Sequence, residues 1–125
     1  MAAAVVASTA EGADWNLVQD RESSVVEIDM ASIAPIAPFD NLKRARVRER
    51  FSSVQKGAND RAFDTSEMVM QIKCAENEAA VQEVNYYLQG KLIKQVVVQP
   101  KDLDFQQGSH VFESLFWRLA CPAIH

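Results

Sequence analysis

The sequence predicts an α+β domain in which an antiparallel β-sheet carries one C-terminal helix. The clearest strand covers residues 67–74, where every second side chain is apolar and is expected to face the core. Near the C-terminus, apolar residues follow the i, i+3, i+4, i+7 spacing of a helix with one apolar face. The apolar residues of the strand are Met68, Met70, Ile72 and Cys74, and those of the helix are Phe112, Leu115, Phe116 and Leu119.

The composition is that of one folded domain. The chain has 125 residues, of which 48% are apolar and 24% charged, and a chain of this length can bury a substantial core. The net charge is -4, so we expect no general attraction to nucleic acid or to an anionic membrane. No apolar run approaches the roughly 20 residues that span a bilayer, and no transmembrane segment is expected.

Residues 1–13 differ from the rest of the chain. The first stretch reads MAAAVVASTA and carries no charge, and Ser8 and Ala10 are spaced like the small residues of a signal-peptidase site. A basic stretch and a longer apolar stretch are missing, so we interpret residues 1–13 as a residual, shortened signal peptide. The alternative is a disordered, alanine-rich N-terminus with no role in export. Residues 14–125 are expected to form a single domain.

Two strands are expected before the first loop. Residues 15–19 and 24–29 are apolar or β-branched, and the polar stretch 20–23 between them predicts a hairpin. Pro35 and Pro38 then favour a loop.

Residues 42–54 form the third expected strand, in which basic and other residues alternate. A helix would scatter these basic residues around its circumference, whereas a strand gathers them on one face. The polar stretch 57–64 predicts a loop. The basic residues of the strand 42–54 form one row, Arg44, Arg46, Arg48 and Arg50, and the opposite face carries Ala45, Val47, Glu49 and Phe51.

A second hairpin and the helix complete the domain. Residues 81–88 and 92–98 flank a Gln-Gly-Lys turn at 89–91, and a proline at position 100 ends the second strand. The helix is expected to begin after Ser109, which is a good N-cap residue. Pro122 disfavours helical geometry at Cys121, so the chain can turn there and bring Cys121 back toward the sheet.

The chain contains two cysteines, Cys74 and Cys121. In an exported protein such a pair predicts one disulfide, and in a cytosolic protein it predicts two unrelated buried thiols. Their spacing excludes a CxxC redox motif and a four-ligand zinc site. The N-terminal segment favours export and therefore the disulfide.

The arginine row, with Lys43 beside it, is the candidate binding site. Four guanidinium groups on one strand face can bind a sulfated sugar, a phosphate or an acidic protein patch. The alternative is a solvated strand face that pairs with neighbouring acids and opposes edge-to-edge aggregation. Nucleic acid is not expected as a partner, because the net charge is negative and no aromatic residues alternate with the arginines.

Enzyme motifs are missing, and no catalytic residue, metal or cofactor is expected. The sequence contains no HExxH spacing, no GxSxG elbow and no phosphate-binding loop. A Cys–His nucleophile with His110 or His125 would need a free thiol. Trp15 and Trp117 are expected in the core or between helix and sheet. The carboxylates that we interpret as solvated or capping residues are Asp20, Asp29 and Asp64.

The order of short motifs over residues 14–122 resembles the surface-adhesin protein E family, whose members are small exported domains of Gram-negative bacteria. The matching segments are Trp15-Asn-Leu-Val18, Glu27-Ile-Asp29, Ser32-Ile33, Cys74, Tyr86-Tyr87, Gly90, Gly108-Ser109 and Trp117-Arg-Leu-Ala-Cys121. The resemblance implies about six antiparallel strands, a C-terminal helix and a bond between Cys74 and Cys121.

The same resemblance implies a function. It predicts an exported surface or periplasmic binding module, which acts as an adhesin on host extracellular-matrix proteins and can form a homodimer. The alternative is a periplasmic structural or housekeeping protein with a bacterial partner. The expected location is the periplasm, the outer-membrane surface or the medium. The dense arginine row at 44–50 departs from a typical member.

Overall fold

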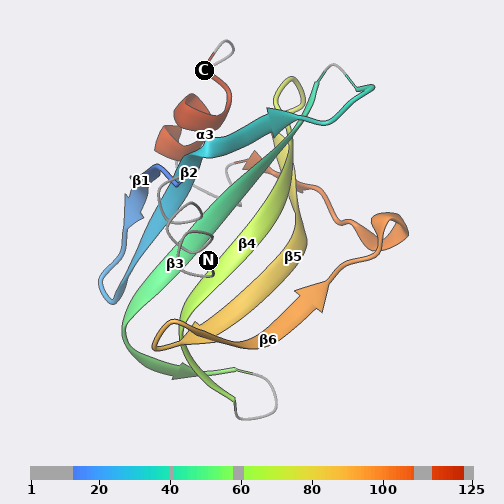
Figure 1. Ribbon diagram of the computed structural model, residues 1–125. Coiled ribbons are helices and arrows are strands. Elements are labelled where there is room, and N and C mark those ends of the chain that lie inside the picture. Colours follow the sequence, from blue (N-terminus) through green and yellow to red (C-terminus); the bar gives the residue numbers. More distant parts are fainter. Residues whose placement is uncertain (1–12, 40, 58–60, 109–113, 123–125) are drawn as a thin grey trace, which may run out of the picture.

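The computed structural model describes residues 13–39, 41–57, 61–108 and 114–122 (Figure 1). Six antiparallel strands follow one another across the sheet in chain order, and a short seventh strand pairs with β5. A short helix, α3 (Ser114–Ala120), follows the last strand. The predicted fold class, an antiparallel sheet with a C-terminal helix and one disulfide, is confirmed. The strands are β1 (Trp15–Asp20), β2 (Ser24–Pro35), β3 (Leu42–Lys56), β4 (Ala62–Lys73), β5 (Glu78–Leu88), β6 (Lys91–Val97) and β7 (Gln106–Gln107), and a 3-10 turn, η2, covers Pro100–Asp102.

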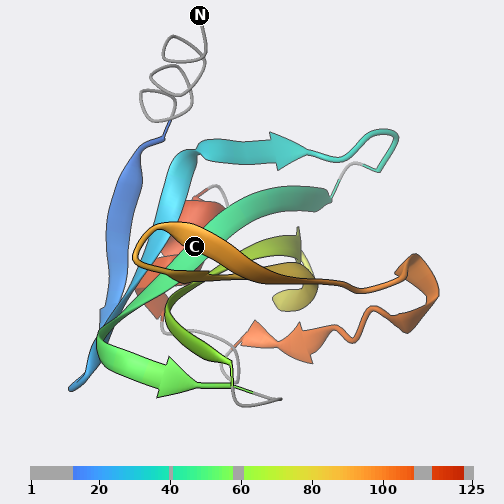
Figure 2. The same cartoon turned by 60° about the horizontal axis from the view of Figure 1, so that its bottom comes forward.

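The sheet is curved, and α3 lies beside β1 and β2 (Figures 1 and 2). Alternating side chains of the central strands pack against the helix and form the core. We call this side of the sheet the core face. Phe116 of α3 is fully buried there, and Trp117 is 3% exposed. The apolar residues packed around them include Val18, Val26, Ile28, Ala45, Val47, Met70 and Ile72.

Trp117 also fixes the segment before the helix. Its indole Nε1 donates a hydrogen bond to the carbonyl oxygen of Gly108 at 3.1 Å. A Cβ at Gly108 would lie 2.6 Å from Nδ2 of Asn77 and 2.8 Å from Cε2 of Trp117, so this position has room only for glycine. The predicted N-cap Ser109 and the first stripe residue Phe112 lie outside the described residues.

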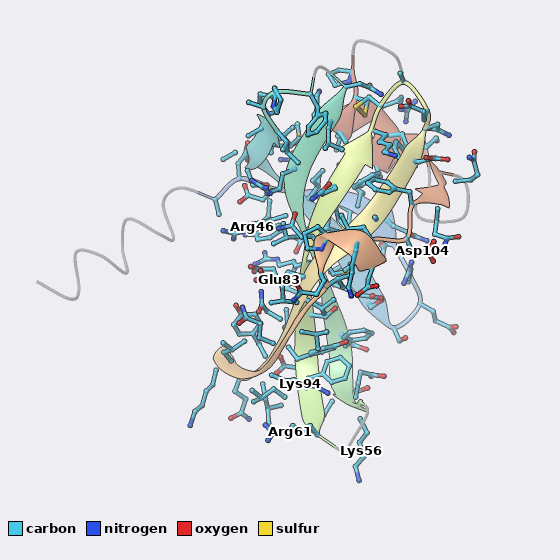
Figure 3. The ribbon with its side chains drawn as sticks, turned by 90° about the vertical axis from the view of Figure 1, so that its right-hand side faces the viewer. Arg46, Lys56, Arg61, Glu83, Lys94 and Asp104 are labelled. Atoms are coloured by element: carbon cyan, nitrogen blue, oxygen red, sulfur yellow. A yellow bond between two sulfur atoms is a disulfide. The ribbon has the colours of Figure 1, made fainter. Side chains whose placement is uncertain are left out.

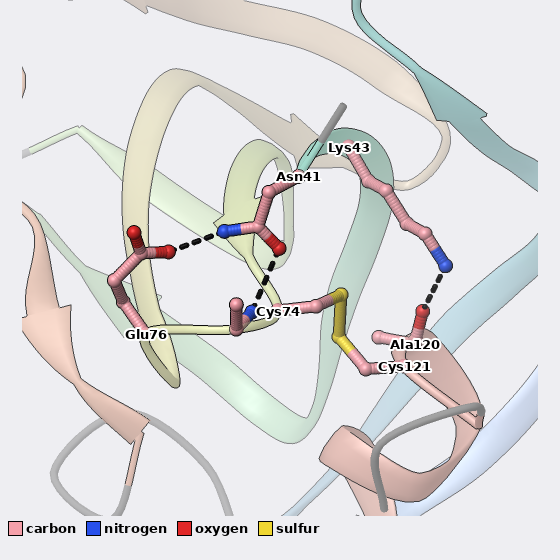
Figure 4. The surroundings of a disulfide bond; sticks show 7 residues. Asn41, Lys43, Cys74, Glu76, Ala120 and Cys121 are labelled. Carbon is pink, nitrogen blue, oxygen red and sulfur yellow. Dashed lines mark hydrogen bonds between the residues drawn. A yellow bond between two sulfur atoms is a disulfide. The ribbon is translucent and has the colours of Figure 1, made fainter. Parts of the chain in front are cut away.

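The disulfide joins the end of β4 to the end of α3 (Figure 4). The Cα atoms of Cys74 and Cys121 are 5.7 Å apart, and both residues are buried. Lys43 Nζ donates to the carbonyl oxygen of Ala120 at 3.1 Å, and the backbone N–H of Ala75 donates to Oδ1 of Asn41 at 2.7 Å. The predicted pairing of the two cysteines is therefore confirmed, and polar contacts brace both of its ends.

Several predicted boundaries were wrong. β2 continues to Pro35 instead of ending at residue 29, and it does so through a bulge. The Ser32 hydroxyl accepts a hydrogen bond from the backbone N–H of Arg46 at 2.8 Å and so replaces a missing ladder contact. Pro35 is tolerated because β2 no longer pairs with β1 there. β4 begins at Ala62, inside the loop expected at 57–64.

Candidate functional site

The predicted arginine row lies in β3, on the face of the sheet opposite the core. Ala45 and Val47 are fully buried on the core face, so the arginines that alternate with them along β3 point the other way. Arg46 and Arg48 are half-buried, whereas Arg44 and Arg50 are exposed. We call this side of the sheet the arginine face. Lys43, which was predicted beside the row, lies at the opposite parity and contacts the end of α3 instead.

A single carboxylate from β2 holds two of the arginines. Register places Glu27 directly beside Arg48. Arg48 Nε donates to Oε1 of Glu27 at 2.8 Å. Arg50 donates to both oxygens of the same carboxylate, at 2.8 Å and 3.2 Å. Bidentate geometry of this kind is the strongest form of an ion pair between side chains.

Arg46 lies between two acids but is held less closely. Its guanidinium is 3.8 Å from Asp29 and 3.6 Å from Glu67. Its Nε is buried and donates no hydrogen bond within the part of the chain that the structure describes. Asp29 is itself buried and accepts the backbone N–H groups of Asp14 at 2.8 Å and Ala31 at 3.1 Å. The central part of the row is thus compensated by acids from β2 and β4.

Trp15 covers the centre of the arginine face. The Arg48 guanidinium carbon lies 4.1 Å from the centre of the indole, and that of Arg46 lies at 5.4 Å. Both distances fall within the range of cation–π contacts. Trp15 was predicted to lie in the core or between helix and sheet, and this was wrong: Trp15 is half-buried and faces the arginines. The spacing of residues along the sequence could not predict this contact, because Trp15 is on β1 and reaches across β2 to the arginines of β3.

Arg44 is the one arginine of the row without an ion pair among the described residues. Next to Trp15 along β1, Leu17 is 48% exposed and shares the arginine face through its pairing with Glu27. The surface therefore combines a stacked aromatic, an exposed apolar side chain, one unpaired cation and several internal ion pairs.

On the arginine face, the pKa of Glu27 is lowered and the pKa of Tyr87 is raised. Burial raises the pKa of Glu27, but hydrogen bonds and charge attraction from Arg50 and Arg48 outweigh it, so its pKa lies below the ordinary 4.5. Burial, with a contribution from Glu67, raises the pKa of Tyr87, so its hydroxyl stays neutral at physiological pH.

We expect Glu27→Gln to reduce the dependence of stability on pH. Because the pKa of Glu27 is lowered by folding, its contribution to stability is present above about pH 4.5 and is lost as the pH falls through the lowered pKa. Chemical denaturation of both proteins between about pH 3 and 6 should show a shallower slope for the variant. Glu22→Gln, an exposed change outside the row, serves as the control. Equal slopes for wild type and Glu27→Gln would contradict the expectation.

Other chemistry is limited at the residues that the structure covers. No three His, Cys, Asp or Glu side chains gather there in an arrangement that can hold a metal ion. Both cysteines are in the disulfide, so neither supplies a thiol nucleophile. His110 and His125 lie outside the described residues. No helix within the described ranges is long and apolar enough to cross a bilayer.

Comparisons with family models, curated proteins and solved structures found no match for this chain. The resemblance to the surface-adhesin protein E family therefore stays a prediction.

Proposed function

We propose that this protein is an exported, non-catalytic binding module whose arginine face contacts a protein partner. The observation that carries the proposal is the stack of Trp15 on Arg48, with exposed Leu17 beside it. Tryptophan and arginine are the residues that most often dominate the binding energy of protein interfaces. Since Arg48 is already held by Glu27, this stack is ordered before a partner arrives, and less entropy is lost on binding.

The charges favour a protein over a polyanion as the partner. Arg46, Arg48 and Arg50 are compensated by acids of this chain, which leaves Arg44 as the unpaired cation of the row among the described residues. A sulfated sugar or a phosphate would have to compete with those acids. A protein surface with charges of both signs can pair with the mixed pattern as it stands.

The disulfide supports a site of action outside the reducing cytosol. Within that setting, an adhesin for host extracellular-matrix proteins is the leading candidate, in line with the family resemblance. The alternative is a periplasmic structural or housekeeping protein that binds a bacterial partner. Protease treatment of intact cells separates the two, because only a surface protein releases peptides from residues 14–122.

A binding assay with purified matrix proteins tests the proposed face. We expect Trp15→Ala to weaken the affinity for a bound matrix protein by about 30-fold, which is typical for loss of an interface hot spot. Arg44→Ser should weaken binding less, and Arg118→Ser should leave it unchanged. Arg118 is a matched control, since it is an exposed arginine on α3. Melting curves must first show that the variants are folded.

Two outcomes would contradict this proposal, the first its contact surface and the second its adhesin function. One is unchanged affinity in Trp15→Ala, which would mean that the arginine face is not the contact surface. The other is no binding to any matrix protein together with no peptides released from intact cells, which would favour the periplasmic alternative.

A further inference from the structure

A small cavity lies at the end of the sheet opposite the disulfide. Its volume is about 230 Å³, and it opens between the β3–β4 connection and strands β5 and β6. Figure 3 shows Arg61 and Lys94 at this end of the molecule, with Lys56 nearby. The lining residues are Gly57, Arg61, Phe63, Tyr86, Ile93, Lys94 and Val96.

The wall of the cavity is aromatic and apolar. The Phe63 ring packs edge-to-face on Tyr86 with 4.9 Å between centroids, and it packs on Phe51 at 5.7 Å. Such contacts hold Phe63 in one orientation. Gly57 keeps the space beside it open, because a Cβ there would lie 3.2 Å from the Phe63 ring. Val96, which is 38% exposed, extends the apolar surface onto β6.

The charges of the described residues that line the cavity are positive. The described lining residues include two basic residues and no carboxylate. Arg61 Nη1 donates to the carbonyl oxygen of Ile93 at 2.7 Å, which positions the guanidinium and leaves its other N–H groups to bind a ligand. Lys94 forms no ion pair with any described residue.

Two acids on the neighbouring strands β3 and β4 already have partners. Glu49 lies in the same cross-strand row as Tyr86, and it is bound by Arg21 at 2.9 Å and by the Ser24 hydroxyl at 2.6 Å. Asp64 accepts the backbone N–H of Gln89 at 3.0 Å. Within the described residues, the two cations of the lining therefore have no ion-pair partner, and they lie beside an aromatic wall in a chain whose net charge is -4.

We propose that this cavity binds a small organic anion with a one- or two-ring apolar body. The rings pack against Phe63 and Tyr86, and a carboxylate or similar group lies between the cationic side chains of the lining. The size sets the class, because drug-sized ligands occupy cavities of about 300–1,000 Å³ and this one is smaller. The site is separate from the arginine face, so the two proposals stand or fall independently.

Titration with two matched compounds tests this proposal. Naphthalene-2-carboxylate is the charged probe, and naphthalene-2-carboxamide is its neutral counterpart of the same shape. Amide chemical shifts of the labelled protein report the affinity and the place of binding. We expect saturable shifts at Tyr86 and Val96, and an affinity for the carboxylate about 10-fold higher than for the amide.

Lys94→Gln should reduce that difference but not abolish it, because it removes one of the two cations of the lining while it keeps a polar side chain of similar length. Lys101→Gln, an exposed change in η2, should leave both affinities unchanged. Melting curves should match the wild type for both variants. The proposal is overturned if no saturable shift occurs at these residues, if the two compounds bind equally, or if Lys94→Gln prefers the carboxylate as strongly as the wild type does.

Discussion

Replacing Cys74 with serine is expected to lower the free energy of unfolding by about 4 kcal/mol. The disulfide closes a segment with a sequence separation of 47 residues. On the chain-entropy model, a loop of this length restricts the unfolded chain by about that amount. Because domains are usually stable by only about 5–15 kcal/mol, the melting temperature should fall by roughly 10–20 °C.

The same bond should control the order of unfolding. α3 has seven residues, which is too short to be stable alone, and it is tied to the sheet by Cys121 and by the Lys43 contact to Ala120. Hydrogen exchange in the reduced protein should therefore rise first in α3 and later in β3 and β4.

Matched variants distinguish the loss of stability caused by breaking the disulfide from the loss caused by changing each side chain. Cys121→Ser should cost about as much as Cys74→Ser, and the double variant should cost little more than either, since each removes the same bond. Thiol titration of the denatured, non-reduced protein should detect no free thiol. Two free thiols in protein from an oxidising compartment would contradict the expected disulfide.

Phe116→Ala is expected to destabilise the protein by about 3–5 kcal/mol. Phe116 is fully buried, and its ring packs edge-to-face on Trp117 with 5.1 Å between centroids. Removal of the ring leaves a cavity between α3 and the sheet, and the surrounding strands are too well paired to collapse into it. Urea denaturation should show a lower midpoint with a similar slope.

Leu119→Ala is the control for this prediction. Leu119 lies on the same helix but is only partly buried against the core. Its truncation should cost clearly less than that of Phe116. Equal losses would contradict the expectation that burial of the side chain against the sheet determines the size of the effect.

The proposed binding surfaces make different demands on the fold. The Trp15 stack depends on the pairing of β1 with β2, which ends at Asp29 and contains a bulge between Leu17 and Gln19. The cavity lies near the end of the β3–β4 pairing, whose register shifts between Arg50 and Gln55. Both surfaces therefore lie beside irregularities in the strand pairing, and such irregularities change the direction of side chains in many β proteins.

Local sequence patterns predicted much of the fold. The alternation in residues 42–54 and 67–74 and the spacing at the C-terminus indicated which side chains face the core. The start of β5, Glu78-Ala-Ala, was missed because these residues have low strand propensity and are held by pairing with β4 and β7. The extension of β2 was missed because prolines normally end a strand.

The sequence alone determined that four arginines share one face, that Cys74 points toward the core and that the chain ends in an apolar helix stripe. Each of these conclusions depends on residue types that repeat at a short spacing within one segment of the chain. The tertiary structure decided that Glu27 and Asp29 compensate the arginines, that Trp15 stacks on Arg48, and that Arg61 and Lys94 line one cavity. These contacts join residues distant in the chain, and their geometry depends on register, bulges and curvature. Such features arise only when all strands pair at once, because one shifted residue sends a side chain to the opposite face.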